Sequence, residues 1–280
     1  MAAGKPGTGL LTRRQAAIAG SLQALCSAVA LTLLAAAAPL AVPDQAIRRS
    51  LDVLVAAYPL ALAGHDGAVL RWRDGTVMPL GEAAANRTFP ERLRHASILD
   101  QIEWRYPRGP LDRPPEVDAD PGRFRNAAFF EKMYGNCRAG EVAGKLVPVS
   151  WLAKTWGKPI RVTAVNGVDA RLRAVSDEIE ALPDPIKRAA YPIAGTYKCR
   201  AVADTGAPSA HGYGIAIDLN LAFADYWLWQ QHAGAIAYRN RMPAAIVDIF
   251  EKHGFIWGGK WYHFDTMHFE YRPELLPAGD

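Results

Sequence analysis

Net positive charge and cysteine are both scarce over most of this 280-residue chain. Of its 32 Lys and Arg residues, three (Lys5, Arg13 and Arg14) precede Asp44, and none of the 28 acidic residues does. The remainder therefore holds 29 basic and 28 acidic residues, a net charge of +1. With no long basic run and so little net charge, nothing predicts binding to nucleic acid. The three cysteines lack a Cys-x-x-Cys spacing and are too few to form a metal site by themselves.

Two common hydrolase signatures are also missing. Without His-Glu-x-x-His, the helical zinc-protease arrangement is excluded. There is no Gly-x-Ser-x-Gly elbow, and Ser209 has only His211 nearby as a candidate base. A hydrolytic site in this chain must therefore be built from other residues.

A long apolar run is present only near the N-terminus. Residues 16–43 carry no charge, basic residues precede them, and small residues lie near Ala38 and Ala41. This pattern predicts a secretory signal over residues 1–43, with an arginine pair that resembles a twin-arginine signal. The run is also long enough for an uncleaved membrane anchor, which would attach the chain to a membrane. Both alternatives predict an exported protein of the periplasm or cell envelope.

Export to an oxidising compartment affects whether the cysteines are expected to form disulfides. Cys137 and Cys199 could form one disulfide, as expected in an oxidising compartment. Two buried thiols are the alternative. Cys26 lies within the apolar run and lacks a lipobox-like Leu-Ala-Gly before it.

Residues 44–125 give few signals, and we treat them as an N-terminal region of unknown role. Within this region, residues 69–78 predict a hairpin, because an Asp-Gly pair suits a tight turn between β-prone runs. Residues 107–122 are rich in Pro, Asp and Arg, which is typical of a surface linker or an extended loop. We therefore place a boundary near residue 125 and a second domain over residues 126–280.

Residues 126–280 mix strand and helix signals. Apolar residues recur at helical spacing in two segments, and three β-prone segments are bounded by turn residues. The pattern predicts an α+β fold with helices packed on a small, mainly antiparallel sheet. The candidate helices are 172–182 and 243–253, and the candidate strands are 160–165, 214–219 and 255–271.

His211 and Asp218 form the first candidate metal-binding pair. Gly212 and Gly214 let the backbone bend between them, so a loop histidine can face a carboxylate on a strand. Asp218 falls within an apolar strand, where an unpaired carboxylate is costly, so a cation or several donors must satisfy it. Zinc would do so, and an ion pair with an arginine or a capped turn is the alternative.

A second polar cluster lies among aromatic residues near the C-terminus. His268 and Glu270 are expected on one face of a strand, with His263 and Asp265 in a turn before it. A polar cluster walled by aromatic rings suits a dry active site, and a surface hairpin is the alternative. Two imidazoles, a carboxylate ligand and a further carboxylate are the groups that a zinc hydrolase needs.

The two segments resemble a known family. Ser-x-His-x6-Asp at 209–218, followed by Asp-x-x-His-Phe at 265–269, resembles the zinc D-alanyl-D-alanine carboxypeptidases and L-alanyl-D-glutamate endopeptidases of bacterial cell walls, the group that includes VanY and VanX. The resemblance spans roughly residues 145–276 and includes 195–200 and 255–261. It implies a Zn²⁺ cofactor and hydrolysis of an amide bond in the peptidoglycan stem peptide.

The resemblance also implies roles for individual residues. His211, Asp218 and His268 would be the zinc ligands, and Asp265 the general base. Glu270 shares the strand face of His268, so it is the rival base or a partner that orients an imidazole.

Other roles are less closely tied to the motif. The resemblance implies that Arg200 stabilises the oxyanion and that Ser209 lines the substrate cleft. His263 is expected to support a ligand or to contact the substrate. A non-catalytic module that binds cell walls and is held together by zinc remains the alternative to a peptidase.

Overall fold

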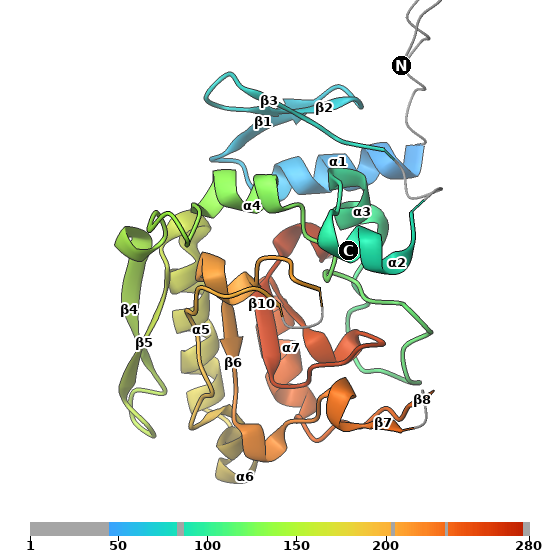
Figure 1. Cartoon of the computed structure of the whole chain (residues 1–280). Coiled ribbons are helices and arrows are strands. Elements are labelled where there is room, and N and C mark those ends of the chain that lie inside the picture. The colour runs from blue at the N-terminus through green and yellow to red at the C-terminus, as the bar shows by residue number, and fades with distance from the viewer. Residues whose placement is uncertain (1–44, 83–86, 203–204, 233–234, 277–280) are drawn as a thin grey trace, which may run out of the picture. The chain divides into compact units, whose positions relative to one another are not determined.

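A computed structural model describes residues 45–82, 87–202, 205–232 and 235–276 of the chain (Figure 1). The secretory signal or membrane anchor predicted for residues 1–43 lies outside these ranges, and so does Cys26. Within the described ranges, no helix is both long enough and apolar enough to cross a bilayer. The predicted α+β class is confirmed, because helices pack here with small antiparallel sheets.

A three-stranded antiparallel sheet carries most of the site. In sheet order its strands are β6 (Ala216–Asp218), β10 (His268–Tyr271) and β9 (Phe255–Trp257). Side chains alternate along β10. Phe269 stacks on Phe250, with 4.0 Å between ring centroids, whereas His268 and Glu270 contact each other on the opposite face. The sheet therefore has one apolar face and one face with ionisable residues.

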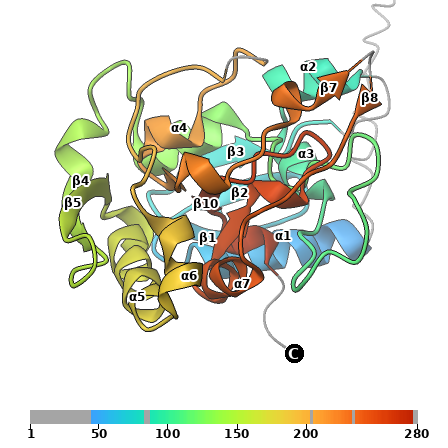
Figure 2. The same ribbon diagram turned by 90° about the horizontal axis from the view of Figure 1, so that it is seen from below.

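Helices cover the apolar side of this sheet (Figures 1 and 2). Helix α7 (Ala244–Lys252) packs on β9, and α5 (Val168–Glu180) lies beside α7. Both helices were predicted from the sequence, since apolar residues at helical spacing form the buried stripe of each. The other elements here are α6 (Asp184–Lys187), the hairpin of β4 (Leu146–Trp151) and β5 (Lys158–Thr163), and the hairpin of β7 (Gln231–His232) and β8 (Ala235–Ile236).

The N-terminal region forms its own small sheet and three helices. Its elements are α1 (Gln45–Ala57), β1 (Leu62–His65), β2 (Val69–Trp72), β3 (Val77–Pro79), α2 (Phe89–Arg94) and α3 (Ile98–Glu103). The hairpin predicted at residues 69–78 is confirmed, with Leu70 opposite Met78 and a turn in which Gly75 has φ +84°. Helix α1 packs on α3 and on a 3-10 turn at Pro273–Leu275.

One cluster of buried apolar side chains connects this region with the remainder. It runs from Leu54 of α1 through Phe130 of α4 (Ala127–Tyr134) to Phe269 of β10. The described residues accordingly form a single compact unit. A separate domain over residues 126–280 stays a prediction from composition.

The prediction that residues 107–122 lie on the surface is wrong for the last residues of the segment. The segment has no helix or strand, but Asp120 and Gly122 are buried, as is Arg123 just beyond. The indole of Trp261 donates to the Pro121 carbonyl at 2.6 Å, and Arg123 pairs with Asp120 at 2.8 Å. Charged composition predicts exposure, but paired charges can be buried when hydrogen bonds satisfy them.

Candidate metal centre and active site

Strand register brings two of the three candidate ligands together. His268, the first residue of β10, pairs directly with Asp218, the last residue of β6. Directly opposed residues carry their side chains on the same face of a sheet. Here His268 Nδ1 lies 2.9 Å from Asp218 Oδ1. One antiparallel pairing thus joins two residues that lie fifty positions apart.

His211 reaches the same point through a tight turn. It lies in a 3-10 turn over Ala210–Tyr213, after which Gly214 (φ +72°) leads the chain into β6. A Cβ at Gly214 would lie only 2.7 Å from Leu146 Cδ2, so glycine is required by both backbone angle and space. The turn leaves His211 Nε2 3.1 Å from Asp218 Oδ1.

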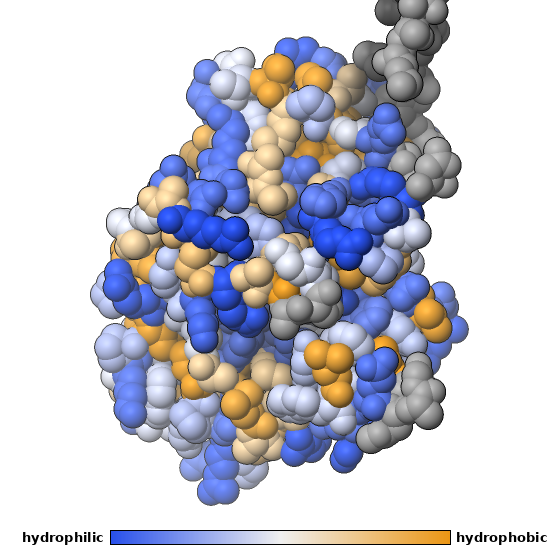
Figure 3. All heavy atoms as spheres, viewed as in Figure 1, coloured by the Kyte–Doolittle hydropathy of each residue, from blue (hydrophilic) through white to orange (hydrophobic). Residues whose placement is uncertain are grey.

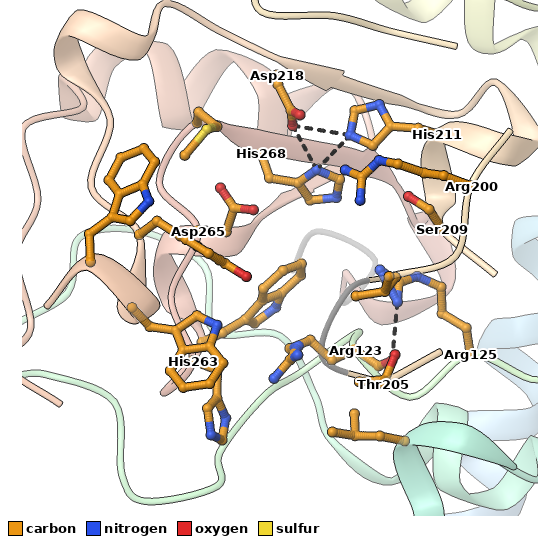
Figure 4. Close-up of a pocket in the computed structure, with 17 residues that line it drawn as sticks. Arg123, Arg125, Arg200, Thr205, Ser209, His211, Asp218, His263, Asp265 and His268 are labelled. Atoms are coloured by element: carbon orange, nitrogen blue, oxygen red, sulfur yellow. Dashed lines mark hydrogen bonds and ion pairs between the residues drawn. The ribbon is translucent and has the colours of Figure 1, made fainter. Parts of the chain in front are cut away.

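The three ligand atoms form a nearly regular triangle (Figure 4). Its sides are 3.1 Å (His211 Nε2 to Asp218 Oδ1), 2.9 Å (Asp218 Oδ1 to His268 Nδ1) and 3.2 Å (His268 Nδ1 to His211 Nε2). A tetrahedral zinc ion with bonds of about 2.0–2.1 Å separates its ligand atoms by about 3.3 Å. The triangle therefore fits one face of a zinc tetrahedron, and the fourth corner is left for water or substrate.

The outer nitrogen of each ring makes a hydrogen bond that points its other nitrogen to the centre. His211 Nδ1 donates to the Thr196 carbonyl, and His268 Nε2 donates to Glu270 Oε2 at 3.1 Å. Glu270 is itself buried and is held by Arg125 at 3.0 Å. Such outer partners set the tautomer of metal-binding imidazoles. The geometry therefore assigns Glu270 to orienting His268 rather than to the role of base.

The cluster requires a positive charge at its centre. Burial alone would raise the pKa of Asp218, but the two imidazoles hold it well below its usual range. Burial alone would lower the pKa of His268, but hydrogen bonds with Asp218 and Glu270 raise it to about 10. A proton held by His268 and a bound metal ion are two ways to supply that charge. Both ligand chemistry and geometry therefore fit zinc.

Asp265 presents a carboxyl group to the same cavity (Figure 4). Its backbone is held tightly, since Asp265 N donates to Gly258 O at 3.0 Å and Asp265 O accepts from His268 N at 3.2 Å. Its Oδ1 is buried and has no hydrogen-bond partner among the described residues. Burial and the nearby charge of Asp218 raise the pKa of Asp265 to about 6. A carboxyl with a free buried oxygen and a raised pKa is suited to proton transfer.

Arg200 and Ser209 line the cavity on its other side (Figure 4). The cavity has a volume of about 340 Å³. Ser209 is buried and its backbone nitrogen donates to the Arg200 carbonyl at 3.1 Å, which ties the two residues together. The exposed Arg200 side chain extends toward the three candidate ligands.

Cys137 and Cys199 form a disulfide, so of the two alternatives the structure contains the bonded pair. The disulfide lies against the turn that carries His211. A Cβ on Gly212 would approach Cys137 Sγ to 3.2 Å, and Lys198 N donates to His211 O at 3.3 Å. The bond therefore anchors the segment from which Arg200 projects.

His263 lines the cavity farther from the ligands (Figure 4). Its Nδ1 lies 2.7 Å from Asp120 Oδ2, and its ring stacks on Phe89 and meets the edge of Trp227. These partners make His263 part of the cavity wall rather than a support for a ligand. Asp120, from the segment that the sequence placed in a linker, thus holds one residue of the wall in position.

Sequence reasoning missed two further parts of the wall. Arg125 reaches the cavity and also bonds to Glu270, and the aromatic residues of 226–229 line the cavity as well. A Tyr-Trp-Leu-Trp run is an available signal in the sequence. Nothing local marks Arg125, because its partner Glu270 lies 145 positions away.

Comparison with known proteins agrees with this geometry. Residues 203–271 match a family model described as D-alanyl-D-alanine carboxypeptidase. The matched segment contains His211, Asp218, Asp265 and His268, whereas Arg200 lies just before it. No curated protein and no solved structure matches the chain. The resemblance predicted from the sequence is confirmed: the segment that carries the candidate metal centre is similar to the D-alanyl-D-alanine carboxypeptidase family of peptidases.

Proposed function

We propose that this chain is a zinc-dependent peptidase that hydrolyses an amide bond in the peptidoglycan stem peptide, as a carboxypeptidase or an endopeptidase. The observation that carries the proposal is the triangle of His211, Asp218 and His268 next to Asp265, whose buried Oδ1 has no hydrogen-bond partner among the described residues. The family match supports a peptidase. The donor set and its need for a positive charge support zinc.

Each residue then has a defined task. Zinc, when bound by the three ligands, supplies a Lewis acid that lowers the pKa of water and polarises the scissile carbonyl. Asp265, whose buried carboxyl faces the same cavity, would accept the proton of the attacking water and pass it to the leaving amine. Glu270 keeps His268 in the tautomer that offers Nδ1 to the metal.

The positive charge of Arg200, on the side of the cavity away from Asp265, suits a peptide with carboxylates. The guanidinium of Arg200 is available to stabilise the oxyanion, an interaction whose loss typically reduces kcat by about 10²–10³. Arg123 and Arg125 also line the cavity, each paired with a buried carboxylate (Asp120 and Glu270), and Ser209 offers a hydroxyl. Stem peptides carry free carboxylates, which this wall would attract.

We propose that the protein acts outside the cytoplasm, in the periplasm or cell envelope. The Cys137–Cys199 disulfide supports an oxidising compartment. Residues 1–43 would deliver the chain there as a cleaved signal or hold it at the membrane as an anchor.

The test is digestion of purified muropeptides by the zinc-loaded protein, read by mass spectrometry. We expect release of an amino acid or peptide that chelation abolishes and zinc restores. Asp265→Asn and Asp265→Ala should lower the rate by about 10²-fold or more, because the proton acceptor is lost, while one zinc per chain remains bound. Unchanged activity in these variants would disprove the mechanism. Wall binding without hydrolysis by the zinc-loaded protein would favour the non-catalytic module.

A further inference from the structure

An exposed aromatic segment continues from the candidate active site. Residues 226–229 read Tyr-Trp-Leu-Trp and include a 3-10 turn at Trp227–Trp229. Trp229 is 55% exposed, although Tyr226, Trp227 and Trp229 all line the cavity that contains the ligands. Exposed aromatic rings that extend an active-site cavity indicate a binding surface rather than part of the core.

The segment is bound through its backbone to the loop between β9 and β10, which carries Asp265. Tyr226 forms a backbone bridge with Asp265, and Trp227 N donates to Phe264 O at 2.9 Å. One residue earlier, Asp225 and Thr266 bond to each other twice, through Asp225 N to Thr266 Oγ1 (2.7 Å) and Thr266 N to Asp225 O (3.0 Å). A ligand on this segment would therefore be held in register with Asp265.

The rings are also ordered before a ligand arrives. Tyr226 packs edge to face with Trp229 at 5.7 Å and with Trp227 at 6.1 Å between centroids. Trp227 in turn meets the edge of His263 at 4.8 Å. A preformed surface loses little side-chain entropy on binding.

The chemistry of the segment suits an uncharged ring with C–H groups on its faces. The face of an indole carries negative partial charge and attracts the weakly positive C–H groups of a pyranose ring, whose hydroxyl groups stay in water. Arg125 and Arg200 lie on the other side of the ligands from Asp265, to which this segment is tied (Figure 4). The cavity thus has Arg125 and Arg200 on one side and aromatic rings on the other, where Arg123 is paired with Asp120 beside His263.

We propose that Tyr226, Trp227 and Trp229 form a subsite for a sugar ring of the glycan to which the stem peptide is attached. The inference rests on the proposed function, because it names a second part of the same substrate. A lipid surface is the competing partner for exposed Leu and Trp side chains. Within residues 226–229 only Leu228 and Trp229 are exposed large apolar side chains, a small surface for a bilayer, which favours a sugar. Figure 3 shows the other apolar residues of the viewed face in small groups among hydrophilic ones.

The first experiment compares two substrates that differ only in the sugar. The zinc-loaded protein is given a free stem pentapeptide and the same pentapeptide linked to its disaccharide. We expect a lower KM for the sugar-linked substrate. Trp229→Ala should raise that KM about tenfold and should raise the KM of the free peptide by much less, so that the difference between the two substrates shrinks. Trp229→Phe should restore part of the difference, and Leu221→Ala, at an exposed apolar residue outside the cavity lining, should change neither value.

Two outcomes of this comparison would overturn the inference. Equal KM values for the two substrates in the unmodified protein would show that the sugar makes no contact. An equal rise in both KM values in Trp229→Ala would assign the indole to the peptide instead.

A binding experiment separates this inference from the proposed function. The zinc-loaded protein is titrated with a disaccharide of N-acetylated amino sugars, and tryptophan fluorescence is recorded. A saturable change that Trp229→Ala abolishes supports the subsite even if neither peptide is hydrolysed, a result that would count against the peptidase alone. No change with the sugar, or loss of binding to anionic lipid vesicles in Trp229→Ala, would overturn the subsite.

Discussion

The imidazole of His268 lies between two carboxylates, Asp218 and Glu270, and this single residue explains much of the behaviour expected of the site. The carboxylates more than offset the effect of burial and raise its pKa to about 10. Below that pH the metal-free protein therefore holds an additional proton on His268. Zinc competes with that proton for Nδ1.

Proton release on metal binding follows from this competition. At pH 8, which is below the raised pKa, zinc should displace about one proton per chain from His268. Calorimetric titrations in two buffers of different ionisation enthalpy measure this number. Apparent affinity should also fall about tenfold for each pH unit of acidification in this range. Binding heats that do not depend on the buffer would contradict the expectation.

Among the elements, the N-terminal helix α1 is connected to the metal centre by a buried hydrogen-bond chain. Tyr58, just after α1, donates to Glu274 at 2.6 Å, and Arg272 bonds to Glu274 at 2.6 Å and to Glu270 at 2.8 Å. Glu270 in turn accepts from His268. A region of no evident role in the sequence thus supports the strand that carries a candidate ligand.

Removing the first donor of this chain should destabilise the protein. Tyr58→Phe leaves Glu274 Oε2 without that donor, and such a loss typically costs about 1–3 kcal/mol. The urea midpoint for unfolding should fall accordingly. Tyr262→Phe, at a partly exposed tyrosine, is the matched control and should shift the midpoint little. Equal midpoints in both variants would show that the chain contributes nothing to stability.

Elements with local signals were predictable, and others were not. Helices α5 and α7 were found from their spacing and from the prolines next to them, and the β2–β3 hairpin from its Asp-Gly turn. Helices α1 and α4 and strand β4 were not singled out. Part of the reason is that α1 is stabilised by packing on residues 273–275, which lie more than two hundred positions away. Propensity is a weak guide where such tertiary contacts decide the outcome.

Across the whole molecule, the Cys137–Cys199 disulfide ties α4 to the segment that carries Arg200. The two cysteines are 62 positions apart, so the bond closes a long loop in the unfolded chain. Replacing both with serine should lower the free energy of unfolding by about 2–4 kcal/mol. Urea unfolding of the double variant measures this loss. Reduction of the unmodified protein should lower its midpoint by a similar amount, and an unchanged midpoint in either case would contradict the prediction.

The sequence by itself determined which chemistry is available, whereas only the tertiary structure decided how it is arranged. His211, Asp218, Asp265 and His268 lie in two short motifs, and residue type and spacing within each motif are properties of the local chain. The strand register that joins the motifs, the cysteine pairing, and the cavity walls from Arg125 and residues 226–229 depend on contacts between distant segments. Those contacts form only when one shared core closes around the sheet, so no local pattern encodes them.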